Sequence, residues 1–515
     1  MTYAGSRSVP RPVLPSLLGL AILWLLASPL SAIPARDVLG AAHAAGKYNF
    51  TDRDFLNEGA DALLEMGTRV IKVWFDPNST PLYPFNSDWG PVPETLAELA
   101  QKPYYQDLFA KPFTTYILVV VRRDVIANFI DGMTREEIGE ERQQMYDLAR
   151  YLLATYGGTG KTFVLQNWEG DHLLRRGLAP EDEPDPVRVR GMIDWWNARQ
   201  RGVTQARRDV RARGVTVAHA AEVNLLRAAM QGRVTATNSV VPFTQADLYS
   251  YSSWDIGYDR ALLTQALDYL AAKAPDSQLY GRRNLYLGEL GIAKDQVGDG
   301  RQKARVIRGL MEAALGWGAR YAIYWQLYCN EPLREYEGRP TNDDMRGFWL
   351  IRPDGSRTRT WTDLSRQFRT SVRRVTLRSA SGRYLTAENG GGGSLWTADR
   401  RPTDWSTFTL QDQDGGSLRS GDEIRLLSHN GMYLSQADAG GYVYANRQEA
   451  GEPETFVIRR IGARDRAEIG PRTPFAIETS NGLYLSPDPQ GALRAQAVRI
   501  GPAETFHLSF ADEAP

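Results

Sequence analysis

The sequence predicts two folded domains, a (β/α)8 barrel over residues 36–367 and an all-β trefoil over residues 371–515. Two patterns lead to this prediction. In the first region, apolar runs of strand length alternate with helix-like segments. In the second, one strand-rich unit occurs three times. A chain of 515 residues is also too long for a single compact core, so more than one domain is expected.

Eight apolar runs of the first region are predicted as the barrel strands. Most are solid rather than alternating, as expected of parallel strands that are covered on both faces. Between them, Thr134 and Glu137 form a capping box, and Met145, Leu148 and Leu152 repeat at helical spacing. The predicted strands are residues 38–40, 69–75, 114–121, 162–167, 215–220, 247–251, 284–289 and 321–327.

Three repeats of about 50 residues fill the second region. The strand-turn motifs Ser381–Leu385, Asn430–Leu434 and Asn481–Leu485 align, and each repeat closes on a phenylalanine, Phe408, Phe456 or Phe506. Three units of four short strands each are what the threefold core of a β-trefoil requires.

The N-terminal residues 1–32 resemble an export signal. Arg7 and Arg11 precede the apolar run Leu14–Leu30, which ends at the small residues Ser31 and Ala32. An uncleaved anchor is the alternative, although the run is short for a span of about 20 apolar residues. No later run is long enough to cross a bilayer. A secreted or envelope-associated protein is therefore expected, and the arginine-rich composition favours a bacterial source.

Composition narrows the possible partners. Basic and acidic residues are both 61, so nothing predicts nucleic-acid binding or an electrostatic membrane patch. Five histidines and the single Cys329 show no metal-ligand spacing, so neither a metal nor another cofactor is expected. A monomer is predicted. The 13 tryptophans and 24 tyrosines suit carbohydrate recognition, because a flat ring matches the C–H face of a sugar.

Functional groups of a (β/α)8 barrel lie where its strands end. The fourth predicted strand ends in Asn167-Trp168-Glu169, the seventh in Gly288-Glu-Leu-Gly291, and the eighth carries Trp325. Two carboxyl groups can cleave a glycosidic bond if one protonates the leaving oxygen while the other, ionised, meets the anomeric carbon. Glu169 and Glu289 are the candidates for this pair.

These segments, in this order, resemble the large clan A of retaining (β/α)8 glycoside hydrolases, of the GH5 type. The resemblance implies that Glu169 is the acid/base, Glu289 the nucleophile and Trp325 a stacking floor for the sugar. It also implies that Asn167 binds the hydroxyl next to the anomeric carbon. In the clan the asparagine and the acid/base are adjacent, whereas here Trp168 separates them, which predicts Asn167 and Glu169 on one side of the strand.

Other polar residues near the predicted strand ends are expected to line the cleft. Trp168 would wall the site with apolar surface, and either Tyr249 or Tyr251 would orient the nucleophile. Glu222 competes as a third carboxylate of the cleft. The remaining predicted substrate contacts are Asp171 and His219.

The three repeats resemble the fascin-like β-trefoil family, and none carries the Gln-x-Trp of the ricin-type relatives. The two resemblances together imply a retaining O-glycosyl hydrolase that cleaves β-linkages of a polysaccharide such as a β-glucan, with the trefoil as an accessory carbohydrate-binding module. A non-catalytic secreted glycan-binding protein on a barrel scaffold is the alternative.

Overall fold

The computed structural model describes residues 33–122, 128–436 and 441–511. The predicted export signal lies outside these residues. Of the described helices, none has both the length and the hydrophobicity that a membrane crossing requires.

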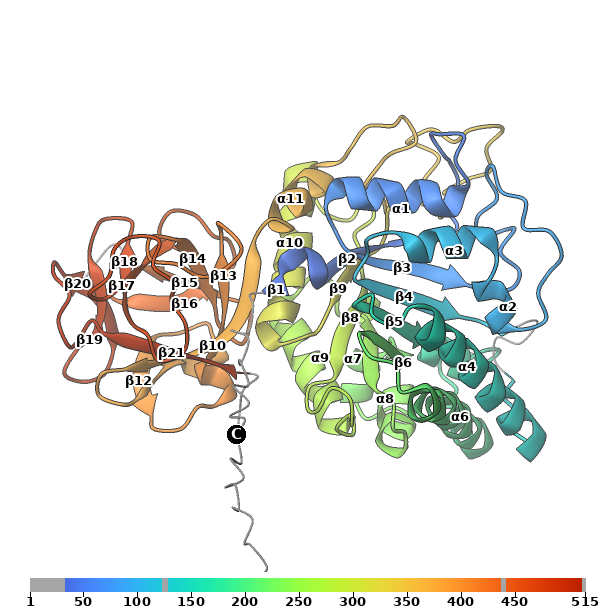
Figure 1. The fold of residues 1–515 in the computed structure, drawn as a ribbon, viewed down its shortest axis with the longest axis horizontal. Coiled ribbons are helices and arrows are strands. Elements are labelled where there is room, and N and C mark those ends of the chain that lie inside the picture. The colour runs from blue at the N-terminus through green and yellow to red at the C-terminus, as the bar shows by residue number, and fades with distance from the viewer. Residues whose placement is uncertain (1–32, 123–127, 437–440, 512–515) are drawn as a thin grey trace, which may run out of the picture. The chain divides into compact units, whose positions relative to one another are not determined.

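Eight parallel strands close into a barrel in chain order, which confirms the (β/α)8 prediction (Figure 1). Neighbouring strands pair in parallel register, and the first strand pairs with the last. Every predicted run overlaps one of them, with ends that differ by a few residues. The barrel strands are β2 (Leu39–His43), β3 (Val70–Phe75), β4 (Thr115–Val120), β5 (Lys161–Gln166), β6 (Val215–Val223), β7 (Leu248–Ser252), β8 (Leu285–Leu290) and β9 (Ala322–Tyr324).

Helices surround the barrel and cover its strands (Figure 1). The capping box predicted at Thr134 is present, because its hydroxyl accepts from the Glu137 N–H while the Glu137 carboxylate accepts from the Thr134 N–H. The α-helices are α1 (Phe55–Met66), α2 (Leu96–Ala100), α3 (Pro103–Ala110), α4 (Arg135–Thr155), α5 (Gly170–Leu174), α6 (Pro186–Val210), α7 (Leu226–Met230), α8 (Ala236–Ser239), α9 (Arg260–Lys273), α10 (Gly300–Trp317) and α11 (Arg359–Gln367). Short 3-10 turns are η1 (Ala35–Asp37), η2 (Val241–Phe243), η3 (Trp254–Ile256), η4 (Glu388–Gly390) and η5 (Asp404–Ser406).

The C-terminal region is an antiparallel β domain with its own hydrophobic core. Each repeat contributes four strands, and the closing residues Phe408, Phe456 and Phe506 are all buried in that core. The strands are β10 (Ser371–Ser379), β11 (Tyr384–Ala387), β12 (Leu395–Asp399), β13 (Thr407–Asp412), β14 (Glu423–Leu427), β15 (Tyr433–Gln436), β16 (Val443–Arg447), β17 (Phe456–Arg460), β18 (Pro474–Thr479), β19 (Tyr484–Pro487), β20 (Leu493–Ala497) and β21 (Phe506–Phe510). A short strand before the barrel, β1 (Ile33–Pro34), pairs with β10.

Two strands of each repeat build a ring and the other two a hairpin. Strands β10, β13, β14, β17, β18 and β21 pair in that order, and β21 returns to β10. The hairpins are β11–β12, β15–β16 and β19–β20. A turn glycine leads into each hairpin, Gly382, Gly431 or Gly482, with φ of 79°, 68° and 78°. This left-handed backbone explains why glycine recurs at that position of the motif.

Candidate active site

Three glutamates gather at the carboxyl ends of the barrel strands. Glu169 is the third residue after β5, Glu222 is the penultimate residue of β6, and Glu289 is the penultimate residue of β8. All three are buried. The Glu169 backbone N–H donates to Glu222 Oε2 at 3.0 Å, which ties the segment after β5 to β6. The two predicted catalytic residues therefore belong to one cluster, with Glu222 between their strands.

A buried lysine completes this cluster. Lys72 of β3 donates from Nζ to Glu289 Oε1 at 2.8 Å, to Glu222 Oε1 at 3.0 Å and to the Gly288 carbonyl at 3.2 Å. Burial lowers the pKa of Lys72, but attraction to the two carboxylates outweighs burial and leaves that pKa raised. The lysine is therefore a fixed cation, and one ammonium faces two buried carboxylates.

Lys72 was not among the residues predicted from the sequence. It is the charged residue of an otherwise apolar strand, Val70–Phe75. Side chains of a strand alternate between its two faces, and the even-numbered residues of this strand share one face. A charge within a solid apolar run is costly unless it is paired, so this position carried a signal of a buried partner.

Glu222 has its acceptor capacity taken up inside the protein. Besides Lys72, its Oε1 accepts from Gln166 Nε2 and Ser250 Oγ, both at 2.9 Å, and its Oε2 accepts from the Glu169 N–H. The residue is fully buried. The sequence suggested a third carboxylate exposed to the cleft, whereas the structure uses Glu222 to hold the strand ends together. Its charge still acts on Glu289.

Glu289 is held by two donors from different elements, Lys72 of β3 and Trp254 of η3. Its Oε2 accepts from Trp254 Nε1 at 3.1 Å, and its Oε1 accepts from Lys72. Burial raises the pKa of Glu289; Lys72 opposes this, while the charges of Glu222 and Glu169 add to it, and the net pKa is raised. Trp254, in the 3-10 turn after β7, is a second contact that the sequence did not reveal.

Glu169 has a different neighbour, the imidazole of His172 one helical turn further along α5. Its Oε2 contacts His172 Nδ1. This hydrogen bond to Glu169 raises the pKa of His172. The His172 side chain is 54% exposed, so it connects the buried carboxyl group to the solvent. Glu289 thus faces a fixed cation, whereas Glu169 faces a group that titrates.

A cleft of about 590 Å³ is lined by His172 and Trp254, which contact Glu169 and Glu289 respectively. The rings of Trp254 and Phe348 meet edge to face within it, with centroids 5.5 Å apart. His172 contributes to the lining from the Glu169 side, and Glu331 and Arg346 form an ion pair of 2.7 Å there. Aromatic surface next to a few polar groups is the usual composition of a small-molecule site.

The two predicted tryptophans lie around this cluster. Trp168 is half-buried, with ring centroids 6.0 Å from Trp74 and 6.1 Å from His172. Trp325 follows β9 and is largely buried, and its N–H donates to the Leu290 carbonyl at 2.8 Å. A Cβ atom on Gly291 would lie 2.5 Å from the Trp325 carbonyl oxygen. Glycine at this position therefore lets the segments after β8 and β9 approach each other.

The polar side chains of Asn167 and Asp171 form hydrogen bonds with backbone groups instead of facing an open cleft. Strand β5 ends at Gln166, so the alternation predicted to place Asn167 and Glu169 on one side does not extend to them. Asn167 Oδ1 accepts from the Glu222 N–H, and Asp171 accepts the N–H groups of Asn224, Leu225 and Ala236. Both residues shape the loops that position Glu169.

Three further predicted contacts also have partners within the protein. The Tyr249 hydroxyl bonds to Thr244, the Tyr251 hydroxyl donates to Asp255 at 2.5 Å, and His219 Nδ1 lies 3.3 Å from Gln200 on α6. All three aromatic residues are buried. Strand alternation accounts for this. On β7 it is Ser250, between the two tyrosines, that faces the carboxylate cluster, and on β6 it is Glu222, which lies on the opposite face from His219. The structure does not bring Tyr249, Tyr251 or His219 to Glu289.

Gly288 provides the room that this cluster needs. A Cβ atom there would lie 1.9 Å from Ser250 Oγ and 2.8 Å from Glu222 Oε1. Any side chain at this position would push β7 and β8 apart. The glycine before Glu289 therefore has a packing reason that is independent of turn geometry.

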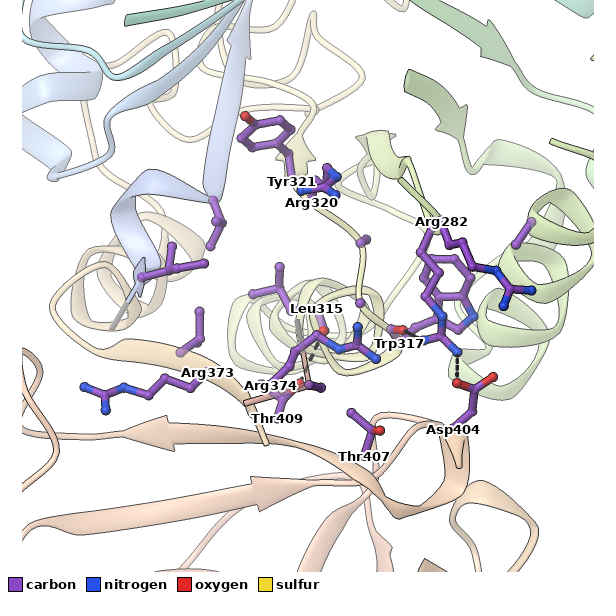
Figure 2. Close-up of a pocket in the computed structure, with 18 of the residues that line it drawn as sticks. Arg282, Leu315, Trp317, Arg320, Tyr321, Arg373, Arg374, Asp404, Thr407 and Thr409 are labelled. Atoms are coloured by element: carbon purple, nitrogen blue, oxygen red, sulfur yellow. Dashed lines mark hydrogen bonds and ion pairs between the residues drawn. The ribbon is translucent and has the colours of Figure 1, made fainter. Parts of the chain in front are cut away.

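A cavity of about 830 Å³ lies at the opposite, amino-terminal ends of the barrel strands (Figure 2). It is lined by residues before β8 and β9 together with residues of β10 and β13. Its charged groups include ion pairs, such as Arg283 with Asp404 at 2.6 Å. None of the predicted site residues lines it. Across the described residues, no three metal-ligating side chains group as a metal site.

Comparisons with known proteins give little further information. No protein-family model matches the sequence, and no curated protein matches it. One solved structure that is similar is a GH39 β-xylosidase from Caulobacter crescentus. The similarity covers 68% of this chain and 84% of that one, with 12% sequence identity and a TM-score of 0.39. At this level it carries no argument about activity, and the proposals below rest on the site.

The contact between Glu289 and Lys72 predicts how activity depends on pH. If Glu289 must be ionised to act, its raised pKa places the acidic limb of kcat/KM above the ordinary range of a glutamate. Lys72→Met removes the largest influence that lowers that pKa. We expect the acidic limb to move up by about 1–3 pH units, measured by pH–rate profiles. The groups that face Lys72 and Glu289 are Glu222, Glu169, His172 and Tyr286.

The matched control is Lys72→Arg, which retains the positive charge although its planar group fits differently. Its acidic limb should stay near that of the wild type. A purely structural role of Lys72 would instead lower the rate of Lys72→Met at every pH without moving the limb.

Proposed function

We propose that this protein is a retaining glycoside hydrolase that cleaves β-glycosidic bonds of a polysaccharide such as a β-glucan. The observation that carries the proposal is the placement of Glu169 and Glu289 in one buried cluster, each with a different electrostatic neighbour. Acid and nucleophile need environments that separate their protonation states. The two environments differ, because Glu289 faces the fixed ammonium of Lys72 whereas Glu169 faces the imidazole of His172.

In the proposed first step, Glu289 attacks the anomeric carbon while Glu169 protonates the leaving oxygen. The glycosidic C–O bond breaks, and an ester forms between the sugar and Glu289. Lys72 and Trp254 hold the Glu289 carboxylate in place through its two oxygens. Fixing both oxygens lowers the cost of orienting the nucleophile when the substrate arrives.

In the second step, Glu169 removes a proton from water, which attacks the same carbon and releases Glu289. His172 contacts Glu169 and is partly exposed, so it offers a route for proton exchange with solvent. Trp254 and Phe348 supply aromatic surface for the sugar ring, and Trp168 and Trp325 are proposed as further walls of the site.

We propose that the β domain is a β-trefoil and an accessory carbohydrate-binding module. Support comes from the closed ring of six strands with three hairpins, one per repeat. Linking such a module to a catalytic domain raises the local concentration of polymer without changing the chemistry. Residues 1–32 are proposed to direct export of a monomeric enzyme from a bacterial cell.

The charge of the cluster favours catalysis over a purely glycan-binding barrel. Two buried carboxylates share one lysine, so the cluster buries more negative than positive charge. Such an arrangement costs stability, and it is typical of sites where function requires the charges. A binding protein gains no affinity for a neutral glycan by burying Glu289.

The test is a panel of defined β-linked polysaccharides, with release of reducing ends as the measurement. We expect at least one polymer to be hydrolysed by the wild-type protein. Binding without hydrolysis across the whole panel would favour the glycan-binding alternative.

A further inference from the structure

The three hairpins of the β domain differ at one equivalent position. Trp396, Tyr444 and Arg494 occupy the same register, opposite Thr386, Ser435 and Ser486 of their hairpin partners. Only the first repeat carries a tryptophan there. The sequence motifs that align the repeats do not include this position, and its residue type differs in each repeat although the strand pairing is equivalent.

Trp396 is open to solvent, whereas its two counterparts meet other side chains. Its exposed fraction is 39%. At the other hairpins, the Arg494 guanidinium lies 3.9 Å from the centroid of the Tyr442 ring, and Tyr442 and Tyr444 are neighbours at 6.4 Å. Among the described residues, neither an aromatic ring nor a guanidinium stacks on Trp396.

A hollow of about 630 Å³ adjoins Trp396 between the first and third repeats. Backbone bridging of Trp396 to Ala492 sets these repeats side by side. The turn on the opposite wall is fixed in advance, because Asp488 Oδ1 accepts the N–H groups of Gln490 and Ala492, each at 3.0 Å. The hollow is therefore built from the first hairpin and a rigid turn.

Polar groups surround this aromatic face. Arg383 and Gln490 line the hollow with exposed side chains. A pyranose ring has an apolar C–H face and hydroxyl groups around its edge. It therefore needs a flat ring beneath it and hydrogen-bonding side chains at its rim, which is the arrangement around Trp396.

We infer that this hollow binds one neutral sugar unit of a polysaccharide chain, with Trp396 as the stacking platform. The inference rests on the proposed role of the β domain and narrows it to one site. A neutral glycan suits the hollow because its lining carries both signs, Arg383 and Asp488. A stable protein partner would need about 800 Å² of surface on each side, far more than one exposed ring.

The experiment uses the full chain and measures binding to microcrystalline cellulose, insoluble β-1,3-glucan and insoluble xylan. We expect wild-type protein to be retained by at least one of them. Trp396→Ala should weaken that binding roughly tenfold, the equivalent of a single good contact, and Trp396→Phe should restore part of it. Circular dichroism and hydrolysis of a small soluble glycoside should be unchanged, because Trp396 is not part of the carboxylate cluster.

The matched control is Trp405→Ala. Trp405 is also in the first repeat and is 48% exposed, but it rests against Gly390 and does not line the hollow. Its variant should bind like the wild type. The inference is overturned if none of the three polymers retains the wild type, if Trp396→Ala binds as tightly as the wild type, or if both variants lose binding equally.

These outcomes are separate from those of the proposed activity. Binding that depends on Trp396 without hydrolysis of any substrate would contradict the proposed hydrolase and leave this site standing. If the wild type hydrolyses insoluble polymer and Trp396→Ala changes neither hydrolysis nor binding, the proposed hydrolase stands and the Trp396 site is contradicted.

Discussion

Glu289→Gln is expected to abolish turnover, with kcat falling roughly 10⁴-fold or more, as for removal of other covalent nucleophiles. The amide cannot form the glycosyl ester, yet it has the same shape, and its single carbonyl oxygen can still accept from either Lys72 or Trp254. Burial disfavours the ionised form of Glu289, which raises its pKa. The neutral variant should therefore unfold at the same temperature as the wild type or at a higher one, measured by calorimetry.

Glu331→Gln is the control, because Glu331 lines the same cleft but pairs with Arg346 rather than with the cluster. It should retain most of the turnover. A change in KM alone for Glu289→Gln would contradict the assigned role, since a residue needed only for binding leaves kcat intact.

Glu169→Ala is expected to slow substrates with poor leaving groups by about 10²–10⁴-fold. Activated aryl glycosides should lose far less in the first step, because their leaving group needs little protonation. The second step then lacks its base, and azide should restore the rate because it attacks without deprotonation. Steady-state kinetics over a leaving-group series, with and without azide, measure both effects.

Glu331→Ala again serves as a control and should show neither leaving-group dependence nor azide rescue. Equal loss for all leaving groups in Glu169→Ala would remove the acid/base assignment. The contact with His172 would then be structural only.

The barrel could be predicted because its strands are buried on both faces. Solid apolar runs such as those in β3 and β4 show this in their composition, and the capping box at Thr134 marks a helix start locally. The β domain was visible for a different reason, since a motif that occurs three times stands out even where each strand is short.

The contacts of the site were harder to predict because they join distant parts of the chain. Glu169 and Glu289 stand at strand ends that the pattern identifies. Lys72, in contrast, meets Glu289 across 217 positions of sequence, and only barrel closure brings them together. Asn167 and Asp171 look like cleft residues in the sequence, but Asn167 bonds to the backbone of β6 at Glu222 and Asp171 to the backbone of the loop that follows. The alternation of side chains holds only as far as the strand extends, and β5 ends before Asn167, so the pattern could not place these residues.

The most direct test of the central claim is proton NMR of the first product released from the polymer that the panel identifies. The account predicts that the new reducing end appears first in the same anomeric configuration as the bond that was cleaved, and then mutarotates. Double displacement at Glu289 requires that result. Initial appearance of the opposite anomer would show a single displacement and would contradict the role of Glu289 as a covalent nucleophile.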